Sequence, residues 1–372
     1  FLLNRSSDLI LKEIVLPNRD RHNIPPLDGP LQPNDSLDSI PVLRSSLESP
    51  DDILIDSEGD LIVSSGNRLL HLSAEGFSKE TVSMEFDSPI GGLSFYREGQ
   101  LLVCVSGKGL AILGEGNSLT WIDRAGDKSI KCPNSSIMDS DGNIYIADGS
   151  LSNDPGCWVK DLMEKRYEGR LVRYQYESDK TDVLLEGMGY PNGLCLSHDG
   201  KWIIVSESWN HSLSRYPLGN IQPHTREVLI PNLPGYPGRI LLSADGGYWM
   251  CLFAMRSELI ELVLSETDFR LDMINNLEIE HWIAPALSSK GDPYEYLQAG
   301  GVRQLGYLKP WAPPRSYGLV VKLDQKMEIT GSLHSRADSS RHGITGLYED
   351  QNRLIICSKG HGVILQSEGL ES

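Results

Sequence analysis

One phrase recurs six times along this chain of 372 residues, and it constrains the fold more than any other feature. Each copy has a short start, a run of alternating apolar residues, a tight turn that usually pairs an acidic residue with glycine, and a second apolar strand. The copies begin at Pro50, Pro89, Pro133, Pro191, Pro237 and His342. Turns of this kind favour two-residue β-hairpin connections, and the second strands are rich in β-branched and aromatic residues. The repeat therefore predicts six antiparallel hairpins.

The spacing of the copies predicts an all-β fold, a six-bladed β-propeller. The first five starts lie roughly one propeller blade apart. Further strands that complete four-stranded blades are expected at residues 68–72, 110–113, 170–174, 212–216 and 317–323. Radial blades leave only short, protected edges. The alternative, an irregular pair of β-sandwiches, would have to produce six copies of one phrase by chance.

Two segments interrupt the repeat. Residues 1–49 are polar and proline-rich, which predicts an extended arm over a propeller body at residues 50–372. Residues 256–315, between blades five and six, carry apolar residues at helical spacing. We expect this helical insertion to be a lid over one mouth of the channel, with a dimer contact as the alternative; the oligomeric state itself is not predicted.

Charge and cysteine content exclude several classes of protein. Acidic residues outnumber basic ones 51 to 34, giving a net charge of −17, which argues against a nucleic-acid groove or binding to an anionic membrane. No run of apolar residues reaches 18, so the sequence predicts no membrane span.

The six cysteines read mainly as buried apolar residues, although Cys132 and Cys157 could pair, and no spacing predicts zinc. Unpaired cysteines favour a reducing compartment such as the cytoplasm, while a removed leader stays open.

Polar residues follow the prolines that begin several blades. Because the loop that enters each innermost strand points into the central channel, Asn134 and Asn192 should face the acids Glu48, Asp51 and Asp52. Carboxylate and amide oxygens are the ligands that calcium prefers. The alternative is that asparagine after proline caps a turn.

Several phrases resemble the strictosidine synthase-like family, within the superfamily of gluconolactonase-type and paraoxonase-type propellers. They are Pro191-Asn-Gly-Leu-Cys-Leu-Ser-His-Asp-Gly, Ser206-Glu-Ser-Trp-Asn, Leu233-Pro-Gly-Tyr-Pro and Ile344-Thr-Gly-Leu-Tyr-Glu. The resemblance covers roughly residues 40–366. It implies an axial calcium ion that organises lactone or ester hydrolysis, with Asn134 and Asn192 as middle-blade ligands. Glu48 matches the lactonase-type first-blade acid, and Asp51 the synthase-type one.

The fifth blade departs from the family phrase, which is Pro-Asp-Asn or Pro-Asp-Gly. This chain has Pro237-Gly238-Arg239, so a ligand carboxylate is replaced by glycine and an arginine follows it. One hypothesis is that Arg239 points into the channel, pairs with Glu48 or Asp51 and supplies the positive charge of the metal. The other is that Arg239 turns outward and calcium binds more weakly.

The sixth blade also departs. The resemblance places the acid/base glutamate of true strictosidine synthases at about Thr345, and no acid lies at residues 344–346. Without a proton acceptor near the amine, strictosidine formation is not expected. We therefore expect a hydrolase of a small lactone or ester, with Arg239 or a cation polarising the carbonyl and His342 or His211 activating water. The alternatives are a non-catalytic propeller that binds or senses a small molecule and a carbon–nitrogen synthase.

Overall fold

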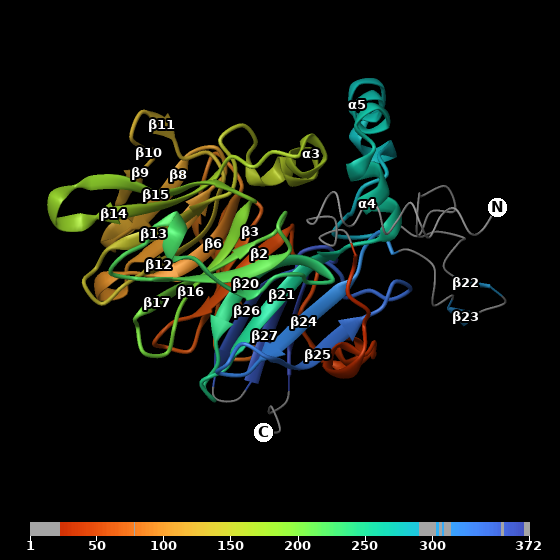
Figure 1. Cartoon of the computed structure of the whole chain (residues 1–372). Coiled ribbons are helices and arrows are strands. Elements are labelled where there is room, and N and C mark those ends of the chain that lie inside the picture. Colours follow the sequence, from red (N-terminus) through yellow and green to blue (C-terminus); the bar gives the residue numbers. More distant parts are fainter. Residues whose placement is uncertain are drawn as a thin grey trace.

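The computed structural model describes residues 23–77, 79–289, 303–304, 307–308, 314–350 and 353–367, and it confirms the six-bladed β-propeller (Figure 1). Blades one to three are β2–β5 (Pro50–Ile55, Leu61–Ser65, Arg68–Leu72, Glu80–Glu85), β6–β9 (Ile90–Phe95, Leu101–Val105, Gly109–Leu113, Leu119–Ile122) and β12–β15 (Pro133–Met138, Ile144–Asp148, Gly169–Gln175, Lys180–Met188). Blades four and five are β16–β19 (Pro191–Leu196, Trp202–Glu207, Ser212–Pro217, Glu227–Ile230) and β20, β21, β24 and β25 (Gly235–Leu242, Tyr248–Met255, Gly318–Leu323, Ile329–Ser335).

The sixth blade closes the ring with a strand from the other end of the chain. It contains β26 (Ile344–Asp350), β27 (Arg353–Ser358), β28 (Val363–Gln366) and the short β1 (Val42–Arg44), which pairs with β28. Thus part of the segment predicted as an arm is the outer strand of the last blade. Residues 1–22 lie outside the described residues.

The innermost strands of neighbouring blades touch one another around the axis. Contacts run from β2 through β6, β12, β16, β20 and β26 back to β2. Glycine at the third position of an inner strand permits this approach. A Cβ on Gly193 would lie 2.3 Å from the carbonyl oxygen of Gly238 and 2.8 Å from the Cα of Arg239. The blades therefore bring polar residues from different parts of the chain to one place.

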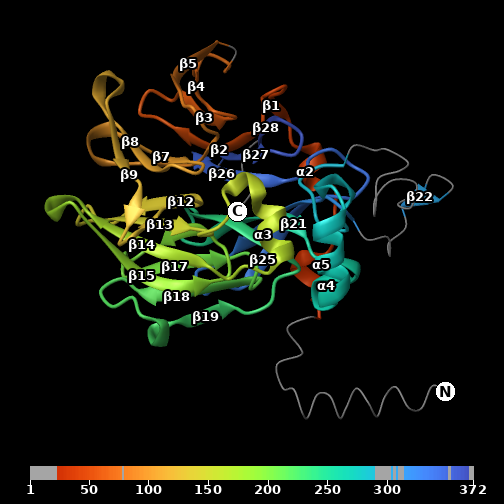
Figure 2. The same cartoon turned by 90° about the horizontal axis from the view of Figure 1, so that it is seen from above.

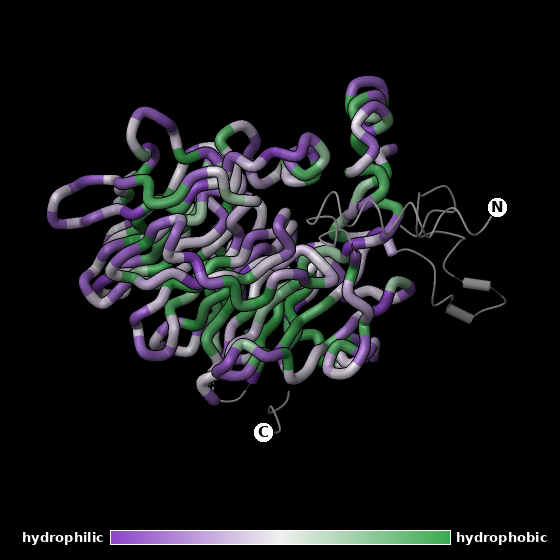
Figure 3. Tube along the Cα trace, in the orientation of Figure 1, coloured by the Kyte–Doolittle hydropathy of each residue, from purple (hydrophilic) through white to green (hydrophobic). Residues whose placement is uncertain are grey.

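The core lies between blades, and hydrophilic turns cover the rim (Figure 3). Every residue of the second strands β3, β7 and β13 is buried, and so is every residue of the longer β21. Such strands read as continuous apolar runs because both faces pack against neighbouring blades. Two further pairs of short strands, β10 with β11 (Arg124–Ala125, Lys128–Ser129) and β22 with β23 (Arg303–Gln304, Tyr307–Leu308), extend from this body.

Three helices lie on one face of the propeller, with α3 near its centre (Figures 1 and 2). They are α3 (Trp158–Glu164), α4 (Glu258–Ser265) and α5 (Thr267–Asn276); a shorter helix, α2 (Ser36–Ser39), packs on β25. In α3, the buried Asp161 accepts hydrogen bonds from Trp209 Nε1 at 2.8 Å and from Asn153 Nδ2 at 3.1 Å. Arg270 of α5 donates to the carbonyl of Met163. These bonds hold α3 over the channel.

All six cysteines are free, so Cys132 and Cys157 are not paired. Five of them are buried, and burial raises the pKa of the Cys104, Cys195 and Cys251 thiols to about 12. They are therefore neutral packing residues at ordinary pH. Within the described part of the chain, no helix is both long and apolar enough to cross a bilayer.

Candidate functional site

A cavity of about 350 Å³ opens at the axis, where the inner strands begin. Its floor is polar and its wall is apolar. The polar lining comes from all six blades or the loops that follow them: Ser49, Asp51, Ser106, Asn134, Asn192, Arg239, Thr345 and Lys359. This volume lies at the lower end of the range for small-molecule sites, about 300–1,000 Å³.

Arg239 lies at the centre of the cavity floor, and its contacts connect four blades. From β20 it reaches across the axis, and its Nη2 lies 2.5 Å from Asp51 Oδ1. Nη2 also donates to the carbonyl of Asn134 at 3.1 Å, and Nη1 donates to the carbonyls of Asp51 and Thr345 at 3.0 and 2.8 Å. Nε lies 3.1 Å from Asp52 Oδ2, a charge contact without hydrogen-bond alignment. The guanidinium is thus fixed by its surroundings.

Glycine in the second blade leaves the space that this guanidinium occupies. A Cβ on Gly92 of β6 would lie 3.3 Å from Arg239 Nη2 and 2.5 Å from the carbonyl oxygen of Asn134. At Gly91 it would lie 3.6 Å from Nη2. Gly238 is equally constrained, since its Cβ would lie 2.8 Å from Cys251 Sγ. The local sequence therefore accommodates an inward arginine and leaves little room for a side chain at residue 238.

The two neighbouring carboxyl groups of β2 differ in their protonation. Burial by itself would raise the pKa of Asp51, but the charges of Lys359 and Arg239 and their hydrogen bonds hold it well below its ordinary value. Burial raises the pKa of Asp52 to about 6, although the positive charge of Arg239 acts to lower it. Burial by itself would lower the pKa of Arg239, but the negative charges of Asp52 and Asp51 raise it above its ordinary value. Asp51 and Arg239 are therefore a permanent ion pair, whereas Asp52 titrates near neutral pH.

Lys359 is the site residue that the sequence reasoning missed. It follows β27 directly, and its Nζ lies 2.5 Å from Asp51 Oδ2. Its side chain is 28% exposed, compared with 13% for Arg239, so it faces the cavity. In blade two, Ser106 follows β7 in the same way and also lines the cavity. The sequence feature that could have identified Lys359 is its position as a charged residue directly after the second strand of a blade.

Both predicted asparagines line the cavity, but their amide groups form hydrogen bonds within the protein. Asn134 Nδ2 donates to the carbonyl of Pro191 at 3.0 Å, and its Oδ1 lies 3.7 Å from Cys132 Sγ. Asn192 Nδ2 donates to Ser208 Oγ at 3.2 Å. Asn134 is buried and Asn192 is half-buried, so the second is the more accessible to a ligand.

Four other predicted residues do not line the cavity: Asp52, which lies behind the floor against Arg239, and Glu48, His342 and His211. The Glu48 side chain is 74% exposed and pairs with Arg68 at 3.3 Å. His342 is fully buried between Ser316 Oγ and the carbonyl of Arg336, both 2.8 Å away, and burial lowers its pKa to about 4. His211 packs edge-on against Tyr236 and lies 3.8 Å from Glu261 of α4.

Thr345 lies on the cavity floor, at the position where the family resemblance placed a catalytic glutamate. Its hydroxyl donates to the carbonyl of Asp51 at 2.8 Å. Among the described residues that line the cavity, Asp51 is the single carboxylate and there is no histidine. Because two cations already hold Asp51, the site offers no accessible base of ordinary strength.

The floor does not fit a calcium ion. Calcium takes six to eight oxygen ligands at 2.3–2.6 Å. Here Asp51 Oδ1 is taken by Arg239 and Oδ2 by Lys359, and Asp52 Oδ1 and Oδ2 accept the backbone N–H groups of Ile53 and Leu93 at 3.0 and 2.8 Å. A divalent cation would have to displace two positive side chains from the carboxylate that it needs.

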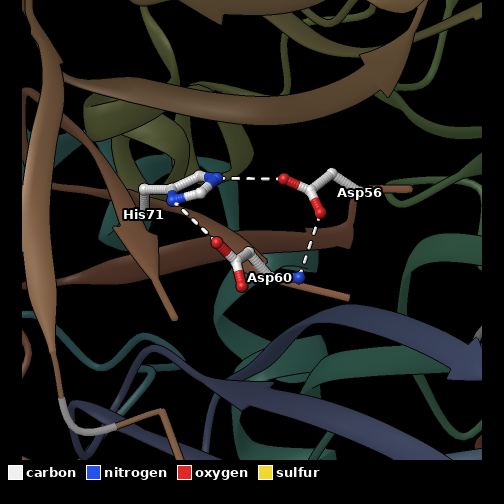
Figure 4. Close-up of side chains that lie close together, drawn as sticks. All are labelled: Asp56, Asp60 and His71. Carbon is white, nitrogen blue, oxygen red and sulfur yellow. Dashed lines mark hydrogen bonds and ion pairs between the residues drawn. The ribbon is translucent and has the colours of Figure 1, made fainter. Parts of the chain in front are cut away.

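A second group of possible metal ligands lies on the rim of blade one, where the side chains of Asp56, Asp60 and His71 point toward one another (Figure 4). His71 Nε2 lies 2.9 Å from Asp56 Oδ2, and Nδ1 lies 3.4 Å from Asp60 Oδ2. Asp56 Oδ1 also accepts the N–H groups of Glu58 and Asp60 in the turn. Each ring nitrogen contacts its own carboxylate, and these contacts connect the turn that contains Asp56 and Asp60 to strand β4.

The apolar lining of the cavity includes three aromatic residues on one side. Trp158 of α3 packs edge-on against Phe253 with ring centroids 5.2 Å apart, and Tyr190 completes this side. Leu287, from the insertion at residues 256–315, also lines the cavity. Helix α3 lies outside that insertion, so the covering of the channel combines two segments.

The fold and the axial cavity together define a propeller with a ligand-sized pocket at its centre. The chain belongs to the SMP-30/gluconolactonase/LRE-like family, whose model matches residues 64–265.

Its relatives include the Arabidopsis thaliana protein STRICTOSIDINE SYNTHASE-LIKE 13, with 30% identity over 176 residues, 46% of this chain and 43% of that one. An adipocyte plasma membrane-associated protein of Bos taurus is 32% identical over 114 residues, 31% of this chain and 28% of that one. The chain spans about half or less of the length of these relatives.

Solved structures share the fold at low identity. A gluconolactonase from Xanthomonas campestris superposes with a TM-score of 0.57 at 14% identity, covering 87% of both chains. A calcium-binding regucalcin from Agrobacterium tumefaciens gives 0.55 at 13% identity, covering 88% of this chain and 92% of that one. These structures share the propeller fold of this chain, whose curated relatives include strictosidine synthase-like proteins.

Proposed function

We propose that this chain binds a small organic molecule in the axial cavity, with a carbonyl or carboxylate oxygen of the ligand against Lys359 and its apolar body against Trp158 and Phe253. The single observation that carries the proposal is the division of the cavity into a cationic floor and an aromatic wall. An ammonium group has three donors, and the contact with Asp51 uses one of them. Asn192 offers a further polar contact beside it.

The second candidate is hydrolysis of a small lactone or ester at the same cavity. Membership of the family and the position of Lys359, which would polarise a carbonyl oxygen, favour it. Water activation is its weaker part, because the depressed pKa of Asp51 makes that carboxylate a poor base. Calcium, which the regucalcin from Agrobacterium tumefaciens binds, is not part of this proposal, because Asp51 already holds two cations.

The test uses the purified chain and a panel of aryl carboxylates, aryl esters and lactones, in EDTA and in millimolar calcium. Binding is followed by thermal shift and calorimetry, and turnover by release of acid. Binding of panel members in EDTA, with recovery of the unchanged compound, supports the binding function. Turnover that Lys359→Met abolishes supports the hydrolase. If no member binds or reacts, both candidates are contradicted.

The pKa of Asp52 gives this binding a pH dependence. When Asp51 and Asp52 are both ionised, the positive charges of Arg239 and Lys359 balance their two negative charges. As pH falls from 7.5 to 5.5, Asp52 gains a proton because its pKa is about 6, and the floor becomes net positive. The neighbouring thiols of Cys104, Cys251 and Cys357 stay neutral throughout, because burial raises their pKa values.

An anionic ligand is therefore expected to bind more tightly at pH 5.5 than at pH 7.5. A unit charge roughly 8 Å away acts with about 2 kcal/mol at an effective dielectric constant near 20, and solvent screening reduces the gain to roughly three- to tenfold. An aryl sulfonate is the suitable probe, since it keeps its own charge over this range. Asp52→Asn should remove the pH dependence; an unchanged profile in that variant would show that another group is responsible.

A further inference from the structure

The axial floor holds as much positive charge as a divalent metal ion would bring. Arg239 and Lys359 each carry one charge, and both lie 2.5 Å from the same carboxylate, one on each oxygen of Asp51. Arg239 also lies 3.1 Å from Asp52, which faces the same centre from the same strand. Two carboxylates and two cations therefore neutralise one another without any ion from solution.

The two cations differ in how firmly they are held. Arg239 is 13% exposed and donates to carbonyl groups of blades one, three and six. Moving it out would leave the buried carboxylates of Asp51 and Asp52 without this guanidinium, which is costly in a protein interior. Among the described residues, the ammonium group of Lys359 has a hydrogen bond only with Asp51, and the Lys359 side chain is 28% exposed. Arg239 is thus the fixed half of the pair and Lys359 the half that faces the cavity.

We propose that Arg239 and Lys359 together replace a divalent cation at the axis, so that the channel site works without metal and becomes a calcium site only when both are removed. A Cβ on Gly92 would lie 3.3 Å from the guanidinium, tighter than an ordinary contact, which supports a built-in place for it. Without the pair, both carboxylate oxygens of Asp51 would lose their partners, while those of Asp52 keep the N–H groups of Ile53 and Leu93. The Asp51 oxygens would then lie next to the backbone carbonyls of Asn134 and Thr345 that Arg239 now binds. Those are hard oxygen ligands of the kind that calcium prefers.

The test is a calcium titration of wild type and of Arg239→Gly/Lys359→Met, followed by thermal unfolding at constant ionic strength, with terbium luminescence as a second readout. Ligands that bind only the folded state raise Tm with concentration. We expect wild type to show no calcium-dependent rise. The double variant should start at a lower Tm and gain at least about 3 °C in 10 mM calcium.

Two control variants locate any ion. Asp51→Asn added to the double variant should remove the calcium response. His71→Gln disrupts the group of Asp56, Asp60 and His71 on the rim, and should leave the response of the channel unchanged. If the double variant folds only with calcium present, that also supports the proposal. Should it not fold at all, Lys359→Met and Arg239→Gly are titrated singly, and a calcium response in either would contradict the requirement that both cations be removed. Wild type is still tested with terbium, where a response at the axis would overturn the proposal.

A calcium response in wild type that Asp51→Asn abolishes and His71→Gln retains would overturn the proposal. So would folded variants without the cation pair that show no response to calcium or terbium. Neither result depends on which organic ligand the cavity takes. Ligand binding is measured separately in EDTA, so failure of the proposed function and failure of the metal replacement are distinguishable.

Discussion

Replacement of Arg239 with methionine is expected to lower the free energy of unfolding by about 3–5 kcal/mol, the range for removal of one partner from a buried ion pair. The variant leaves Asp51 with Lys359 alone and removes the charge that faces Asp52, whose side chain is 7% exposed. It also removes the guanidinium donor from carbonyl groups of three blades, of which that of Asp51 keeps the Thr345 hydroxyl. Urea unfolding followed by tryptophan fluorescence measures the change.

Arg353→Met is the matched control. Arg353 pairs with Asp350 at 2.6 Å, but the two side chains are 37% and 26% exposed, so the loss should be within about 1 kcal/mol. Adding Asp52→Asn to Arg239→Met should recover part of the lost stability, because one uncompensated buried charge is then removed. A loss of less than about 1 kcal/mol in Arg239→Met would mean that the guanidinium is not the centre of the floor.

Replacement of Lys359 with methionine is expected to weaken binding of a carboxylate probe by roughly 10- to 100-fold, since a hydrogen bond to a charged group contributes about 1.5–3 kcal/mol. The fold should be retained, because Asp51 keeps its contact with Arg239 and Lys359 is partly exposed. Calorimetry with the tightest aryl carboxylate of the panel measures the affinity, and urea unfolding checks the fold.

Lys359→Arg should restore part of the affinity, because it keeps the positive charge at the cavity floor. Lys108→Met is the control: Lys108 forms an exposed pair with Asp87 on the surface and should leave affinity unchanged. If Lys359→Met binds the probe as wild type does, the ligand does not contact this part of the cavity.

The repeated hairpin phrase was sufficient to predict the propeller because it reports local geometry. An apolar strand, a tight turn and a second strand pair with each other within a few residues, as Pro191–Leu196 and Trp202–Glu207 do. The closing strand Val42–Arg44 could not be found in this way. It is three residues long, none of them is buried, and its partner lies at the opposite end of the chain. Helix α3, with seven residues, was not expected either.

The convergence of polar residues at the axis was also predictable, since loops that enter inner strands meet there. Asp51, Asn134, Asn192 and Arg239 all line the cavity. What each does there depends on side-chain partners that strand position does not specify. The Glu48 side chain turns to Arg68 at the surface; the backbone of the next residue, Ser49, has φ +49°. His342 begins a blade, yet its ring is buried between Ser316 and Arg336.

The most direct measurement is a high-resolution crystal structure of wild type grown in 10 mM calcium chloride, with anomalous data to identify any calcium. We expect Arg239 between Asp51 and Asp52 and Lys359 on Asp51, with no ion at the axis. A calcium ion bound to Asp51, Asn134 and Asn192, with Arg239 displaced from the floor, would contradict the account.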